Sequence, residues 1–91
     1  MGEELRDRVF RYVERFALRH ALTKWPTVRQ VAQGLSVGMN RVVEAVSDDG
    51  QFPSSRDLPR MRILYVDVKY ADMQIAVDSP KIDALRKALQ R

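Results

Sequence analysis

Residues 25–46 read WPTVRQVAQGLSVGMNRVVEAV, and this stretch decides the fold. Its spacing predicts two short helices joined by a tight turn at Gly34-Leu35-Ser36. Where two helices cross steeply over a short turn, the residues at their closest approach must be small. Ala32 and Ala45 supply these small side chains. The angle between the helices is then filled by apolar residues: Leu35, Val37, Val42 and Val46. This is the spacing of a helix-turn-helix.

The same stretch contains signals for where each helix begins and ends. Thr27 and Gln30 have the spacing of a capping box, so the first helix should begin at Thr27. It should end near Gln33-Gly34, because glycine readily takes the left-handed C-cap conformation. The second helix is expected over 38–47, with either Ser36 or Gly38 as its cap. Its inward residues should be Met39, Val42, Ala45 and Val46.

The motif WPTVRQVAQGLSV resembles the opening of winged helix-turn-helix domains of bacterial regulators, and it is similar to SOS-repressor-type and plasmid-regulator domains. The resemblance covers residues 25–46, and the flanking elements agree in order and length alone. Ser36 stands where such domains usually have a turn glycine, and Gly38 where they usually have Ser or Thr. The resemblance implies one mostly helical α+β domain over 1–91. Its parts would be three helices, a two-stranded wing and a C-terminal helix.

An amphipathic helix is expected before this motif, over about 3–21. Apolar residues recur at helical spacing from Leu5 to Ala17. On the opposite face lie four cations at steps of three and four: Arg8, Arg11, Arg15 and Arg19. They could follow a phosphate backbone. We favour a solvated face, in which Glu4 and Asp7 pair with Arg8 and Arg11.

After a loop over 47–60, the sequence predicts a hairpin. Alternating apolar and β-branched residues indicate strands at 61–69 and 73–78. Tyr70-Ala71-Asp72 would form the short turn between them. This hairpin, over 61–78, would be the wing.

A terminal helix is expected over about 80–90. Ser79-Pro80 is a helix start, with Ser as N-cap and Pro at the first helical position. Its apolar stripe could hold a second copy of the chain or pack back onto the first helix. We favour a homodimer, since DNA-binding domains of this size gain specificity by doubling their half-site. The stripe consists of Ile82, Leu85 and Leu89.

If residues 38–47 form a recognition helix, its outer side carries groups that can contact base edges. Asn40 can pair with adenine, Glu44 can accept from the cytosine amino group, and Val43 can pack on a thymine methyl group. Arg41 can contact guanine or hold a phosphate. The predicted DNA-binding residues are Thr27, Arg29, Gly38, Asn40, Arg41, Val43, Glu44, Ser47, Arg60, Arg62 and Lys69.

Acidic residues weaken the DNA interpretation. Glu44, Asp48 and Asp49 make this helix and its end net acidic, whereas phosphate contacts supply most of the affinity of DNA-binding proteins. The motif is therefore specific for the fold and only suggestive for DNA. Two functions remain. One is a small regulator or accessory factor that binds double-stranded DNA in the major groove. The other is a winged-helix module that docks onto a protein without specific DNA binding.

Composition bounds the remaining possibilities. The chain has 91 residues, of which 45% are hydrophobic and 31% charged, as expected for one folded domain. The absence of cysteine excludes disulfides and thiolate metal sites, and favours a cytoplasmic, nucleoid-associated protein. The sequence has no signal-peptide core and no apolar run that could cross a membrane. The net charge of +4 favours an acidic partner, nucleic acid first.

Catalysis is not expected. The sequence has no Gly-rich phosphate loop, no nucleophile with a histidine partner and no carboxylate pair in an apolar setting. Its acids are expected on exposed faces. The single histidine, His20, has no cysteine or second histidine with which to hold a metal. We therefore expect no enzyme activity, no cofactor and no metal.

Overall fold

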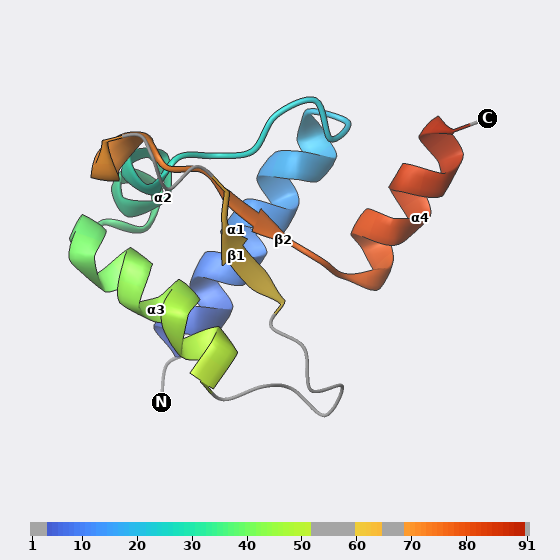
Figure 1. The fold of residues 1–91 in the computed structure, drawn as a ribbon. Coiled ribbons are helices and arrows are strands. Elements are labelled where there is room, and N and C mark those ends of the chain that lie inside the picture. The colour runs from blue at the N-terminus through green and yellow to red at the C-terminus, as the bar shows by residue number, and fades with distance from the viewer. Residues whose placement is uncertain (1–3, 52–59, 65–68, 91) are drawn as a thin grey trace.

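The computed structural model describes residues 4–51, 60–64 and 69–90. Over these ranges the chain is mostly helical, with four α-helices and one small antiparallel sheet, so the fold is of the α+β class (Figure 1). None of these helices combines the length and apolar character that a membrane-spanning segment needs. The elements are α1 (Leu5–Arg19), α2 (Val28–Leu35), α3 (Met39–Gln51), β1 (Met61–Ile63), the 3-10 helix η1 (Tyr70–Asp72), β2 (Ile75–Val77) and α4 (Pro80–Leu89).

Helix α1 forms where the periodicity predicts it and ends slightly earlier. Val9, Val13 and Ala17 repeat at steps of four and are fully buried. Beyond the helix, Ala21 and Leu22 both have positive φ, at 51° and 62°. The backbone N–H of Leu22 donates to the carbonyl of Ala17 at 2.8 Å. This left-handed turn ends the helix, although neither residue type favours positive φ.

Helix α2 begins as predicted but does not end as predicted. The Thr27–Gln30 capping box is present, with reciprocal hydrogen bonds of 2.9 and 3.2 Å. The expected glycine C-cap is wrong: Ser36 takes the left-handed conformation, with φ of 57°. Gly34 lies inside the helix. A Cβ at this position would come within 2.3 Å of a ring carbon of Tyr12, which explains why the residue is glycine. Its role is to admit a neighbouring helix, not to supply positive φ.

Helix α3 begins directly after Gly38, whose carbonyl accepts hydrogen bonds from two residues of its first turn. Of the two caps considered, Ser36 therefore ends α2 and Gly38 precedes α3. The expected inward position of Met39 is wrong, since it is 37% exposed. The helix also continues to Gln51, four residues past the predicted end. The predicted inward residues that are buried are Val42, Ala45 and Val46.

A buried carboxylate joins α3 to the sheet. Asp49 is only 3% exposed, which contradicts the expectation that all acids lie on exposed faces. The backbone N–H groups of Arg60 and Met61 donate to its Oδ2, the second at 2.9 Å. The guanidinium of Arg60 lies 3.5 Å from Asp49 Oδ1 and 3.2 Å from Asp7, and it stacks over the Phe10 ring. This cluster ties α1, α3 and β1 together.

Within the described residues, the two strands are shorter than predicted. Strands β1 and β2 pair antiparallel, with Met61 opposite Val77 and Ile63 opposite Ile75. The residues of the predicted turn, 70–72, form the 3-10 helix η1, which lies between the two strands in the chain. Part of the first predicted strand, 65–68, lies outside the described residues.

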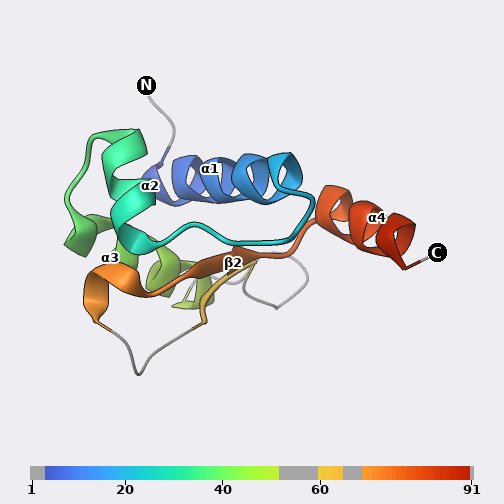
Figure 2. The same ribbon diagram turned by 90° about the horizontal axis from the view of Figure 1, so that it is seen from above.

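Strand β2 is the buried centre of the β structure. All three of its residues are buried. On the side away from β1, it bonds to the segment that leads into α2. Ile75 donates to the carbonyl of Pro26 at 3.0 Å, and Val28 donates to that of Met73 at 2.8 Å. Figure 2 shows α1 on one side of the molecule and the strands across from it. The core therefore lies between α1, α3 and β2.

Helix α4 starts as predicted and projects from the rest of the molecule (Figures 1 and 2). The hydroxyl of Ser79 accepts from the N–H of Ile82 at 3.2 Å, and Pro80 is the first helical residue. The predicted apolar stripe is divided. Ile82 is fully buried in the core, Leu85 is half-buried and Leu89 is 54% exposed.

We predict that Gly34→Ala lowers the free energy of unfolding by about 1–3 kcal/mol, because its new methyl group overlaps the Tyr12 ring. Alanine elsewhere in a helix is more favourable than glycine, so the sign of the effect reports the contact. Gly38→Ser is the matched control, since a Cβ there meets only Arg41 Cγ at 3.9 Å. Urea unfolding measures both variants. A G34A domain as stable as the wild type would contradict the close packing of α1 on α2.

We also predict that Asp49→Ala lowers the free energy of unfolding by about 2–5 kcal/mol, because it leaves two backbone N–H groups and the Arg60 side chain without their acceptor. Asp48→Ala removes the same charge from the neighbouring exposed position and should change stability little. Thermal and urea unfolding compare the pair. Equal losses in the two variants would show that Asp49 does not hold α3 to the sheet.

Candidate nucleic-acid interface

The predicted recognition residues of α3 lie together on its surface. We call Asn40, Arg41, Val43, Glu44 and Ser47 the outer arc of α3. Four of them are exposed, and Val43 is half-buried at the edge of the core. Their arrangement follows from the burial of the opposite side of the helix, which fixes its rotation about its own axis. A partner approaching α3 from outside meets an amide, a guanidinium, a carboxylate and a hydroxyl.

The candidates at the start of α2 lie near η1. Thr27 is half-buried and its side chain serves the capping box. Arg29 is exposed and lies 3.8 Å from the carboxylate of Asp72 in η1. Both members of this ion pair are more than half exposed, so it holds Arg29 only weakly. Gly38, at the start of α3, is also exposed.

The basic candidates near the sheet differ in what they can offer. Arg60 is bound to Asp7, Asp49 and Phe10, which gives it a structural role that sequence reasoning missed. Arg62 is exposed on β1 and pairs with Asp78 at 2.6 Å. Lys69 is exposed, and the residues before it, 65–68, lie outside the described part of the chain. Arg62 and Lys69 are therefore exposed and available, whereas the partly exposed Arg60 is already held by contacts within the fold.

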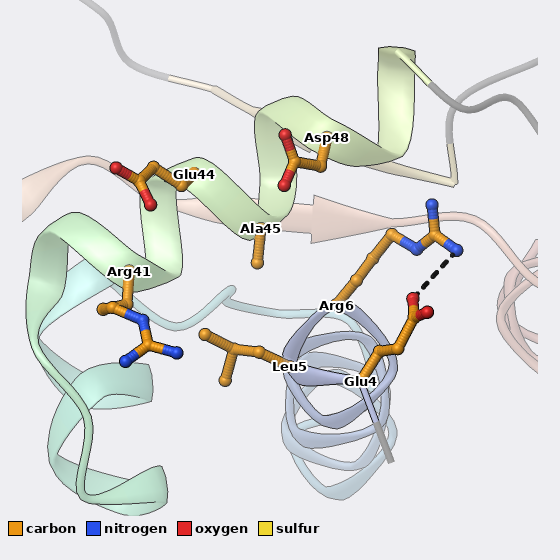
Figure 3. Close-up of a pocket in the computed structure, with 7 residues that line it drawn as sticks. All are labelled: Glu4, Leu5, Arg6, Arg41, Glu44, Ala45 and Asp48. Carbon is orange, nitrogen blue, oxygen red and sulfur yellow. Dashed lines mark hydrogen bonds and ion pairs between the residues drawn. The ribbon is translucent and has the colours of Figure 1, made fainter.

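A mixed-charge groove separates α3 from the beginning of α1 (Figure 3). Arg6 and Glu4 pair across 3.4 Å on the α1 side. Arg41 approaches Leu5 from the α3 side (Figure 3). The lining holds three carboxylates and two guanidiniums, so this edge of α3 disfavours an anion. The residues that line it are Glu4, Leu5, Arg6, Arg41, Glu44, Ala45 and Asp48.

The surface of α3 carries fewer acidic side chains than the sequence predicts. Glu44 and Asp48 are exposed as expected, but Asp49 is buried and paired with Arg60. One expected surface acid is thus buried, and the side chain of the base that pairs with it, Arg60, stays 36% exposed. The periodicity contained the signal: Asp49 follows Val42 and Val46 at helical spacing, on the buried side.

Comparison with known proteins identifies no relative of this chain. No protein-family model matches the chain, and no curated protein or solved structure gives a significant match. The function is therefore inferred from the chain's own residues. What the chain presents is two packed helices, a tight turn between them and an exposed arc on the second helix.

Proposed function

We propose that this domain is a winged helix-turn-helix DNA-binding regulator or accessory factor, with α3 in the major groove of double-stranded DNA. The observation that carries the proposal is the α2–α3 unit. Its two helices are joined by residues 36–38 alone, with Ser36 in the left-handed conformation. Ala32 and Ala45 are both buried, as a close crossing of two helices requires. The outer arc of α3 is left exposed.

The dimensions of α3 suit this role. With 13 residues it is about 20 Å long at 1.5 Å per residue, and the major groove accepts an α-helix. In helix-turn-helix proteins the N-terminal part of the recognition helix contacts base edges. Asn40 and Glu44 occupy that part and carry groups that recognise adenine and cytosine. The connection between β1 and β2 would serve as the wing.

Phosphate contacts in this proposal come from four cations: Arg29, Arg41, Arg62 and Lys69. The exposed ion pairs of Arg29 and Arg62 are weak enough for a phosphate to replace the carboxylate. We no longer include Arg60 among the phosphate-binding residues that the sequence predicts. Turning it outward would leave the buried carboxylate of Asp49 without its cation, which is costly.

A protein-docking module is the second candidate, and the acidic edge of α3 favours it. Glu44 and Asp48 lie beside the groove to α1, where a phosphate backbone would be repelled. A basic protein partner would be attracted to the same edge. The two candidates differ in whether DNA binding depends on salt and on the outer arc.

The contact surface of the proposed homodimer is limited to the C-terminal part of α4. Ile82 belongs to the core of its own chain, so it cannot also contact a second copy. Leu85 and Leu89 remain accessible along the projecting helix. A symmetric pair of α4 helices would present two α3 helices to successive half-sites.

For DNA binding, we predict that Asn40→Ala and Glu44→Ala each change sequence preference by about 1–3 kcal/mol at one base pair. Arg41→Ala and Arg62→Ala should weaken binding to all sequences and reduce the salt slope by about one unit each. Lys81→Ala, on the distant helix α4, is the control and should leave both quantities unchanged. Selection from a randomised duplex pool and a salt titration measure these effects. A domain without salt-sensitive DNA binding at low ionic strength would support protein docking instead.

For the dimer, we predict that Leu89→Glu yields a monomer with an unchanged unfolding transition, because this side chain is 54% exposed in the single chain. Ile82→Glu should instead abolish folding, since it buries a charge in the core. Sedimentation equilibrium over a range of micromolar concentrations measures association. A wild-type chain that stays monomeric at high micromolar concentration would remove the dimer and the expectation of a palindromic site.

A further inference from the structure

Helix α1 carries a continuous positive face that the DNA proposal does not use. We call it the arginine stripe: Arg8, Arg11, Arg15 and Arg19. All four side chains are exposed, and they extend about 16 Å along the helix at 1.5 Å per residue. They lie opposite the buried face of α1. The stripe therefore points away from the core.

A shallow groove runs along this stripe, and we call its aromatic and aliphatic lining residues the apolar floor. Its other lining residues are Tyr12, Phe16 and Leu35, the last from the end of α2. The lining therefore combines four guanidinium groups with two aromatic rings and one aliphatic side chain, and it includes no carboxylate. This composition contrasts with that of the groove in Figure 3, where acids outnumber bases.

The carboxylates that the sequence assigned to the stripe pair with other cations. Glu4 pairs with Arg6, and Asp7 pairs with Arg60, neither of which belongs to the stripe. Arg8 donates to the backbone carbonyl of Leu35 at 3.4 Å, a contact that keeps its charge. Arg11 has an interaction within the chain. The inference below therefore rests on the other three arginines.

The floor of the groove is formed before any partner arrives. The ring of Tyr12 lies against Gly34, where a Cβ would come within 2.3 Å of the ring. The Phe16 ring packs at 4.5 Å from that of His20. Side chains held in place lose little further freedom on binding, which favours association. The groove thus presents preformed apolar side chains and cations side by side.

We propose that this groove docks an acidic, amphipathic segment of a partner protein. Carboxylates of that segment would pair with Arg8, Arg15 and Arg19, since guanidinium groups bind carboxylates in a bidentate manner. An apolar side chain of the segment would cover Tyr12 and Leu35. A DNA duplex would use the cations but leave this apolar floor uncovered. The inference goes beyond DNA binding, because the partner would engage α1 while the outer arc of α3 stays accessible.

The test is an NMR titration of the isotope-labelled full chain with a synthetic helical peptide. The probe carries Glu at three positions spaced by four residues, with Leu between them, and a second peptide has Gln in place of Glu. We expect the Glu peptide to shift the amide signals of Tyr12, Gly34 and Leu35, and the Gln peptide to bind at least tenfold more weakly.

Variants assign the effect to the stripe. Arg15→Glu with Arg19→Glu should weaken binding of the Glu peptide at least tenfold, and Arg15→Gln with Arg19→Gln should weaken it less. Lys81→Glu with Lys87→Glu makes the same charge change on α4 and should alter binding less than threefold. An absence of binding, shifts elsewhere, or equal losses in both Glu double variants would overturn the proposal. So would a DNA duplex that shifts the same signals and displaces the peptide.

Discussion

The burial of Asp49 is the constraint on which the rest of this structure depends. A carboxylate that is 3% exposed must be hydrogen-bonded and paired, and here two backbone N–H groups and one guanidinium provide this. Because Asp49 lies near the end of α3 and its partners begin β1, the helix is fixed in rotation and in distance from the sheet. That fixed rotation turns the outer arc of α3 outward. The same cluster holds Arg60 over the Phe10 ring and against Asp49, with 36% of its side chain exposed.

Features governed by neighbouring residues could be predicted from the sequence, and features governed by distant ones could not. The capping box at Thr27 and the helix start at Ser79 need only a few adjacent residues, and both are present. Because glycine suits positive φ, the sequence predicts a helix end at Gly34, but the structure instead places Gly34 against the ring of Tyr12, 22 positions earlier. The exposed arc of α3 followed from helical periodicity alone. The ion pairs of Arg29, Arg60 and Arg62, which are candidate DNA-binding residues, join separate elements of the fold. Counting charges along the chain therefore could not predict these pairs.

Charge divides this small domain into surfaces with different chemistry. The edge of α3 beside α1 carries Glu44 and Asp48, whereas the far side of α1 carries the arginine stripe. The net charge of +4 is therefore unevenly distributed and does not in itself identify α3 as the site of a polyanion. DNA binding through α3 must rely on the outer arc and on weakly paired cations such as Arg62. The proposed DNA contact on α3 and the proposed docking groove on α1 therefore lie on different surfaces of the domain.

Mapping the surface of the domain that contacts DNA tests whether α3 enters the major groove. Isotope-labelled protein is titrated with a mixed-sequence duplex at low salt, and amide shifts are followed by NMR. If α3 enters the groove, the largest shifts should lie at Asn40, Arg41 and Glu44 and at the start of α2, with little change along the arginine stripe. Shifts that are confined to α1, or a spectrum that the duplex leaves unchanged, would contradict this placement of α3.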